Sequence, residues 1–249
     1  MIAILSPAKN MRSAKMQGLS LTEPDYSRQT AELSALLRAM SPWQFESAMQ
    51  LNPDLALKAF GLSQDFPEDI VSARGGSAAA LSYYGLAYQH LDAATLSLED
   101  FAFAQDHLRI VSALYGLLRP ADRIFPYRLE FQCRVKPGGK SLYAFWGGRL
   151  REDLFRLGEP VINLASGEYS KAVRPKHSGQ GTMITCEFKT RRGQKLITLP
   201  TEAKMARGRM ARFIVQNRLD SPERLTSFDW GGWTFQPGLS SGDTLVFIR

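Results

Sequence analysis

The chain has 249 residues, of which 44% are hydrophobic and 22% are charged, and its net charge is +7. This composition is typical of a globular protein with a core and excludes a disordered or collagen-like chain. No apolar run approaches the roughly 20 residues that cross a bilayer, and Met1–Asn10 has the pattern of a strand and not of a secretion signal. We therefore expect a cytoplasmic protein with no membrane partner.

The sequence has few residues that ligate metals. Its three histidines are far apart, and Cys133 and Cys186 do not form a CxxC pair. It also has no Walker or Rossmann phosphate motif. We expect no metal site, no cofactor and no disulfide framework. A peroxide-sensing pair of Cys133 and Cys186 is an open alternative.

Helices and strands alternate along the chain. Apolar periodicity and capping residues predict helices at 30–40, 41–49, 54–60, from Phe66 onward, 97–107, 142–157 and 201–219. Apolar or alternating runs predict strands at 2–5, from Leu108 onward, and at 160–164, 182–189, 194–199, 233–235 and 244–248. The order predicts an α/β fold, with a mixed sheet and surrounding helices, in a single domain of residues 1–249.

Positive charge is concentrated in one part of the sequence. Residues 189–218 contain nine basic residues and one acidic residue, Glu202, so this window has a net charge of +8. A local excess of this size favours a polyanion or a small anionic ligand as the partner. A solvated basic face is the alternative.

Polar residues follow several of the predicted strands and flank the basic helix. Because residues just past neighbouring strand ends of an α/β sheet converge on one crevice, we expect them to form a site. Lysine and arginine would hold an anion, a buried glutamate would act as a general base, and the tyrosines would stack on a nucleobase. The candidate catalytic residues are Lys9, Glu130, Glu168 and Lys171. The candidate nucleic-acid or anion ligands are Lys9, Arg119, Tyr127, Arg128, Tyr169, Lys171, Lys204, Arg207 and Arg212. A structural ion-pair network would need the same residue types.

Several blocks of the sequence resemble the YaaA family of bacterial peroxide stress proteins. They are LSPAK at 5–9, YGLLRP at 115–120 with PYRLE at 126–130, NLASGEYSK at 163–171 and AKMARGRMARFI at 203–214. The resemblance implies a role in peroxide defence and in limiting free iron, which would be indirect because no iron ligand set is present. It also implies DNA binding and a helix-hairpin-helix-like element near residues 41–60. Pro53 in that turn has no N–H to give to a phosphate, and an ordinary helix pair is the alternative.

These observations lead to a hypothesis of function. We expect a monomeric peroxide stress protein that binds double-stranded or structured DNA through a basic cleft. The alternative is an enzyme that acts on a nucleotide, nucleobase or nucleic-acid bond in the same cleft, and an adaptor that binds another protein is a third hypothesis.

Overall fold

The structure is a computed structural model that describes residues 1–249 apart from the side chain of residue 178. Its α-helices are α1 (Ser27–Arg38), α2 (Pro42–Met49), α3 (Pro53–Asp65), α4 (Ala79–Ser82), α5 (Leu86–Leu91), α6 (Leu98–His107), α7 (Leu142–Trp146), α8 (Arg149–Phe155), α9 (Gly167–Ser170) and α10 (Pro200–Gln216). Its strands are β1 (Ile2–Leu5), β2 (Asn10–Met11), β3 (Ser77–Ala78), β4 (Tyr83–Tyr84), β5 (Leu108–Ser112), β6 (Gly116–Leu118), β7 (Arg123–Ile124), β8 (Val161–Asn163), β9 (Met183–Arg192), β10 (Lys195–Ile197), β11 (Thr234–Phe235) and β12 (Thr244–Ile248). No helix in the described part of the chain is long and apolar enough to cross a bilayer.

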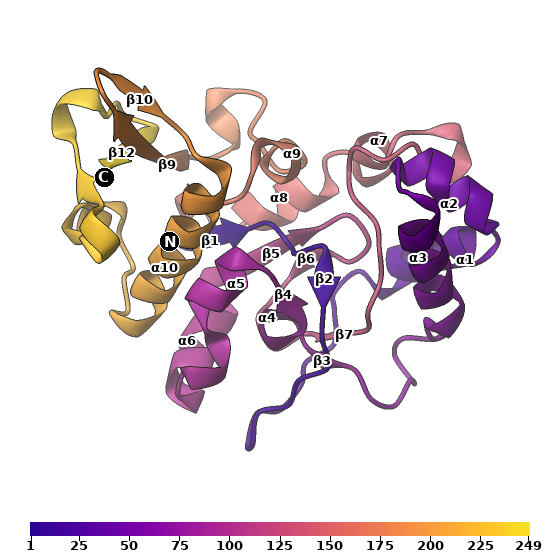
Figure 1. Cartoon of the computed structure of the whole chain (residues 1–249). Helices are drawn as coiled ribbons and strands as arrows, with labels where there is room; N and C mark the ends of the chain where they lie inside the picture. The colour runs from indigo at the N-terminus through magenta and orange to yellow at the C-terminus, as the bar shows by residue number, and fades with distance from the viewer.

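An eight-stranded mixed sheet, counted over the described residues, forms the centre of the fold in the order β11-β12-β9-β8-β1-β5-β6, with β10 paired to β9. Strands β12, β9, β8, β1 and β5 run parallel. Strands β11, β6 and β10 run antiparallel to their neighbours. The predicted α/β class with a mixed sheet and surrounding helices is confirmed. Figure 1 shows β1, β5 and β6 between two groups of elements, with α10, β9 and β12 on one side and α1 to α3 on the other.

The central strands are short and apolar because both of their faces are covered. Every residue of β1 and β8 is buried, which is the pattern of a parallel strand enclosed between layers. Helix α10 packs against α5, α6 and β1. The carboxyl ends of β1, β8 and β5 therefore lie along one edge of the sheet, and the segments that follow them are brought together there.

Capping residues set the helix starts that the sequence predicts. Ser41 and Ser97 each form a capping box with the residue three positions later, and Asn52 accepts the Leu55 N–H. Helices α2 and α3 pack against each other. Whether this pair acts as a helix-hairpin-helix stays a prediction.

Two predicted helices differ from the structure. The segment 142–157 forms α7 and α8 separately, because Gly147 adopts a φ of +58° between them. No helix starts at Phe66. The Arg123 guanidinium instead binds the carbonyls of Ile70, Val71 and Ala73, which a helix would use in its own ladder.

The strand that begins at Leu108 leads into a hairpin and not directly into the polar loop. Gly116, with a φ of +75°, opens β6, and a Cβ there would lie 2.7 Å from the Tyr26 ring. Strand β6 pairs antiparallel to β5. The chain therefore returns to the amino edge of the sheet at the end of β6, and residues 125–131 then run back toward the carboxyl edge.

Candidate functional site

The ends of β1 and β8 are joined by serine side chains at the carboxyl edge of the sheet. The Ser166 N–H donates to Ser6 Oγ at 2.9 Å, and Ser6 Oγ donates to Ser166 Oγ at 3.3 Å. Tyr88, on α5, donates its hydroxyl to the Ser6 carbonyl at 2.9 Å. The segments carrying Lys9 and Glu168 are thus held beside each other, as the parallel order of the strands predicts.

Glu130 is the carboxylate at the centre of this edge. Its Oε1 lies 2.6 Å from Arg128 Nε, and its Oε2 lies 3.7 Å from Lys9 Nζ. The Arg128 and Glu130 side chains are 15% and 17% exposed, whereas Lys9 is 68% exposed. The Lys9–Glu130 pair is therefore weak, and the Lys9 ammonium is available to a ligand. Pro7, Tyr127 and Tyr169 line the shallow pocket around these groups.

Glu168 is a second, half-buried carboxylate beside Glu130. The Gln132 N–H donates to its Oε1 at 3.1 Å. Burial, and then the negative charge of Glu130, raise the pKa of Glu168, although the Gln132 N–H and Lys9 oppose the rise. A carboxyl group perturbed in this way beside cations is typical of a site that moves protons or binds charged ligands.

Aromatic rings form the wall around Glu168. The Tyr143 hydroxyl donates to the Glu168 carbonyl at 2.9 Å, and the Tyr143 ring stacks on Phe131 with centroids 5.1 Å apart. Lys171 Nζ lies 4.7 Å from the centroid of the Tyr143 ring. Since Lys171 is exposed, its ammonium is held at the rim of the pocket by a cation–π contact and faces solvent.

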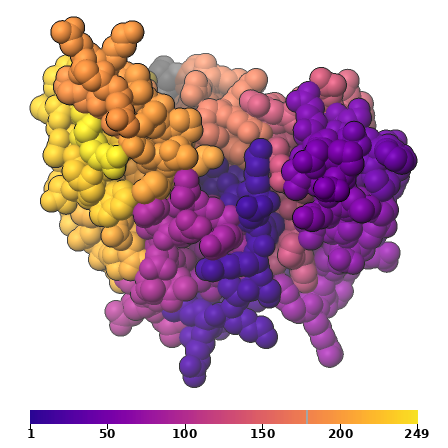
Figure 2. All heavy atoms as spheres, viewed as in Figure 1, coloured from indigo at the N-terminus to yellow at the C-terminus, as the bar shows by residue number. Residues whose placement is uncertain are grey.

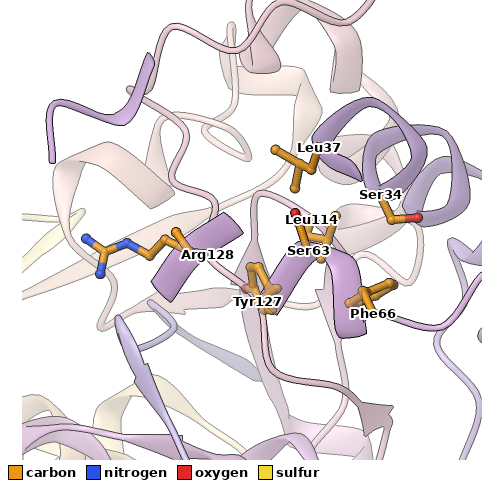
Figure 3. A pocket seen from close by; sticks show the side chains of 8 residues that line it. Ser34, Leu37, Ser63, Phe66, Leu114, Tyr127 and Arg128 are labelled. Carbon is orange, nitrogen blue, oxygen red and sulfur yellow. The ribbon is translucent and has the colours of Figure 1, made fainter. Parts of the chain in front are cut away.

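Tyr127 and Tyr169 are core residues, which differs from the prediction that they stack on a nucleobase. They are 6% and 7% exposed. The Tyr127 hydroxyl lies 2.7 Å from Ser112 Oγ and 2.8 Å from the Tyr83 hydroxyl. Figure 3 shows the Tyr127 ring in a pocket that Ser63, Phe66 and Leu114 also line, with the neighbouring Arg128 pointing away from it. The hydroxyl is satisfied inside the core, so the ring faces inward and offers little exposed surface on which a base could stack.

The basic helix α10 brings only its first half to the carboxyl edge. It begins after β9 and β10, where Glu202 binds Thr190 and Arg249, and it ends near the amino edge, where Asp220 accepts a bond from the N-terminal amine. Lys204 and Arg207 therefore lie toward the carboxyl edge, Lys204 exposed and Arg207 partly buried. Arg212 lies further along and donates to the carbonyls of Leu91 and Asp92 at 2.9 Å, so it caps the C-terminus of α5.

Arg119 does not join the site. It follows β6, which runs antiparallel to β5, and therefore lies at the opposite edge of the sheet. Its guanidinium binds Asp122 at 3.0 Å, Asp25 at 3.4 Å and the Glu23 carbonyl at 2.7 Å. Arg119 is therefore separated from Tyr127, the other candidate ligand close to it in the sequence.

Among the predicted site residues at this edge, cations outnumber carboxylates. The cations are Lys9, Arg128, Lys171, Lys204 and Arg207, and the carboxylates are Glu130 and Glu168. In Figure 2 the surface dips between the orange C-terminal part and the purple part that contains α1 to α3, and the indigo N-terminal segment lies in this dip.

Three groups that organise the site are absent from the sequence prediction. Ser6 joins the strand ends, Tyr88 fixes the Ser6 carbonyl, and Tyr143 holds the Glu168 backbone. The sequence could have identified Ser6 as a site residue, since it directly follows a predicted strand. Tyr88 and Tyr143 carry no local pattern that distinguishes them from other core aromatic residues.

Neither cysteine is expected to react with peroxide at neutral pH. Burial raises the pKa of Cys133 to about 11 and the pKa of Cys186 to about 12. At pH 7 only about one Cys133 thiol in ten thousand would be a thiolate, the reactive form. Alkylation by iodoacetamide should therefore be slow at pH 7 and increase about tenfold per pH unit until pH 11. Rapid labelling of either residue by a sulfenic-acid probe after micromolar peroxide at pH 7 would contradict this expectation.

Replacing Glu168 with glutamine should stabilise the protein at neutral pH but not in acid. Between the ordinary pKa of glutamate, about 4.3, and the raised pKa in the folded state, the native protein keeps a proton that the unfolded chain has lost. Wild-type stability thus falls as pH rises through that window. Glutamine keeps the acceptor for the Gln132 N–H. The difference in melting temperature between Glu168→Gln and wild type should grow from pH 4 to pH 8. A difference that does not change with pH would refute the buried-charge argument.

The fold and the site together define a class: an α/β protein with lysines, an arginine and two glutamates gathered at the carboxyl edge of a mixed sheet. Residues 1–239 match the family model described as peroxide stress protein YaaA. The chain belongs to this family. It is 40% identical to a UPF0246 protein of Saccharophagus degradans, over all of this chain and 99% of the relative. It is also 42% identical to one of Maricaulis maris, over all of this chain and 96% of the relative, and 34% identical to one of Clostridioides difficile, over the full length of both.

Proposed function

We propose that this peroxide stress protein binds DNA through the crevice at the carboxyl edge. The supporting observation is the set of exposed lysines at that edge: Lys9 has only a 3.7 Å contact to a carboxylate, and no ion pair of Lys171 or Lys204 occurs in the described part of the chain. An exposed ammonium group without a close carboxylate can replace its solution counterion by a DNA phosphate without breaking an ion pair within the protein. Bound DNA would be shielded from peroxide damage, and any effect on free iron would be indirect.

The proposed binding is directed at phosphates and depends on structure more than on sequence. The tyrosines expected to stack on bases are buried, which leaves positive charge as the main attraction. Contacts to phosphates position DNA without reading its sequence. Double-stranded or structured DNA is the expected partner.

Fluorescence anisotropy of a labelled DNA duplex at four salt concentrations tests this proposal. We expect micromolar or tighter binding with a negative slope of log affinity against log salt, from which the number of contacted phosphates follows. Two duplexes of equal length and unrelated sequence should bind within about threefold of each other. Absence of binding at 50 mM salt would rule the proposal out.

One observation favours the enzymatic alternative. Glu168, with its raised pKa, lies beside Glu130, which is held by Arg128 and Lys9. Two carboxyl groups in different environments are the arrangement that general acid–base chemistry uses. In this alternative Glu168 would carry the transferred proton, Glu130 would be the ionised partner, and Lys9 and Lys171 would hold the substrate.

Ligand length separates the two hypotheses. Affinity that increases with oligonucleotide length supports the DNA-binding protein, whereas binding confined to mononucleotides or free bases supports the enzyme. Incubation of each ligand with wild type and Glu168→Gln, followed by product analysis, would show any turnover. Product formed by both proteins at equal rates would exclude Glu168 as the proton donor.

A further inference from the structure

Tyr84 is an exposed aromatic side chain beside the carboxyl edge of the sheet. It is 42% exposed, whereas Tyr83 before it is buried and lies with its hydroxyl 2.8 Å from that of Tyr127. Because successive side chains of a strand point to opposite faces, the burial of Tyr83 turns Tyr84 toward solvent. Tyr84 therefore offers the flat aromatic surface that the buried Tyr127 and Tyr169 do not.

Two contacts hold Tyr84 beside the segment that carries Lys9. Strand β4 pairs antiparallel with β2 and places Tyr84 opposite Asn10 (Figure 1). On the other side of Lys9, a Cβ added to Gly85 would lie 3.3 Å from the Cβ of Ala8. The chain at Tyr84 and Gly85 thus runs along the residues before and after Lys9. A nucleic acid held by the Lys9 ammonium would lie next to Tyr84.

Arg12 places a guanidinium against the same ring. Its Cζ lies 5.0 Å from the centroid of the Tyr84 ring, which is a cation–π contact. The Arg12 backbone N–H donates to the Ser82 carbonyl at 2.8 Å, whereas its Nε reaches the Leu81 carbonyl only at 3.5 Å. No ion pair of Arg12 occurs in the part of the chain that the structure describes. The guanidinium therefore extends the flat surface of the ring and keeps donors for a group from outside the chain.

The hollow beside this ring has polar groups suited to the edge of a nucleobase. It has a volume of about 180 Å³, and Arg12, Tyr84, Tyr88, Gln89 and Asp92 are among the residues that line it. Gln89 and Asp92 are exposed. An amide can donate to and accept from a base edge, and a carboxylate accepts from the exocyclic amine of a base. The same carboxylate repels a phosphate, so the hollow favours a base.

We propose that Tyr84 and Arg12 form a stacking site for one unpaired nucleobase. The inference rests on the proposed function in that the base belongs to bound DNA. A base within a duplex is stacked between its neighbours, whereas a base at a bulge or at a single-stranded end is free to stack on the protein. Every base has a π-face, so the site should accept all four bases. The protein should therefore prefer DNA with an unpaired base to a fully paired duplex.

The first test compares two labelled duplexes of equal length, one fully paired and one with a single extrahelical base, by fluorescence anisotropy. We expect wild type to bind the bulged duplex at least fivefold more tightly. Tyr84→Leu keeps an apolar side chain but removes the ring, so this preference should disappear. Tyr84→Phe keeps the ring and is the matched control that should retain the preference. A preference of equal size in wild type and Tyr84→Leu would overturn the stacking site.

The second test locates the base by cross-linking. A duplex whose extrahelical base is 5-iodouracil is irradiated in complex with the wild-type protein, and the cross-linked peptide is identified by mass spectrometry. We expect the cross-link at Tyr84 and at least a threefold lower yield in Arg12→Gln, which loses the cation on the ring. A cross-link confined to other residues would overturn the assignment. This test uses wild type, so it decides the question even if Tyr84→Leu does not fold.

The source of the base is decided by a free deoxynucleoside, observed by saturation-transfer NMR. Binding of the deoxynucleoside without any binding of DNA, lost in Tyr84→Leu, would support the stacking site and refute the DNA proposal. The opposite result is also distinct. Salt-dependent binding of the paired duplex, with no preference for the bulged duplex, would refute the stacking site and leave the DNA proposal standing.

Discussion

Replacing Gly208 with alanine is expected to destabilise the protein by about 3 kcal/mol or more, a large effect for one added methyl group. The added Cβ would lie 1.9 Å from the carbonyl oxygen of Ala87 and 2.7 Å from its carbonyl carbon. Both are backbone atoms, so no rotamer change can relieve the overlap. Helix α10 would have to move away from α5, and this contact also positions Arg207 and Tyr88. Urea denaturation followed by circular dichroism would measure the loss.

Gly61 provides the matched control in the same protein. It lies within α3, and a Cβ there would have no neighbour within 4 Å. Gly61→Ala should therefore stabilise the protein by about 0.5–1 kcal/mol, because alanine loses less backbone entropy in a helix. If both alanine variants changed stability equally, the close approach of α10 and α5 would be wrong.

The double variant Lys171→Ala/Lys204→Ala is expected to bind duplex DNA about tenfold more weakly and to reduce the salt slope by about two units. Each exposed lysine accounts for roughly one phosphate contact, and each contact contributes about 0.9 to the slope. Both side chains are exposed at the carboxyl edge, and neither supports the core. The melting temperature should therefore stay within about 2 °C of wild type.

The control removes the same charge from the other edge of the sheet. Arg156 precedes β8, and Arg224 lies 3.6 Å from Asp220 near the start of β1. Arg156→Ala/Arg224→Ala should leave the salt slope unchanged and lower affinity by less than about threefold, through net charge alone. Equal losses in both double variants would mean that overall charge, and not the crevice, attracts DNA.

Local sequence patterns predicted the elements whose formation depends on neighbouring residues. The caps at Ser41 and Ser97 are formed by contacts three residues apart, and the predicted helices that follow them are present. The apolar runs at 2–5 and 160–164 contain β1 and β8. The sequence predicted that Lys9 and Glu168 each follow a strand, and the structure makes these two strands parallel neighbours, so the two residues come from adjacent strand ends.

Contacts between distant segments decided the rest. A helix from Phe66 has acceptable local propensity, but Arg123, more than 50 residues later, takes its carbonyls. Arg119 and Tyr127 are eight residues apart in the sequence but lie in different places. Strand β6 carries Arg119 to the opposite edge of the sheet, whereas Tyr127 packs among α1, α3 and Ser112. No pattern within the loop contains that information.

By itself the sequence determined the α/β class and the basic helix, because composition, periodicity and the order of elements along the chain can be read from the sequence alone. Only the tertiary structure decided which of those charges face solvent. Lys204 and Arg207 are three residues apart on one helix, yet the first is exposed and the second is partly buried. Burial depends on which elements pack on each face of α10, and that is a property of the assembled fold.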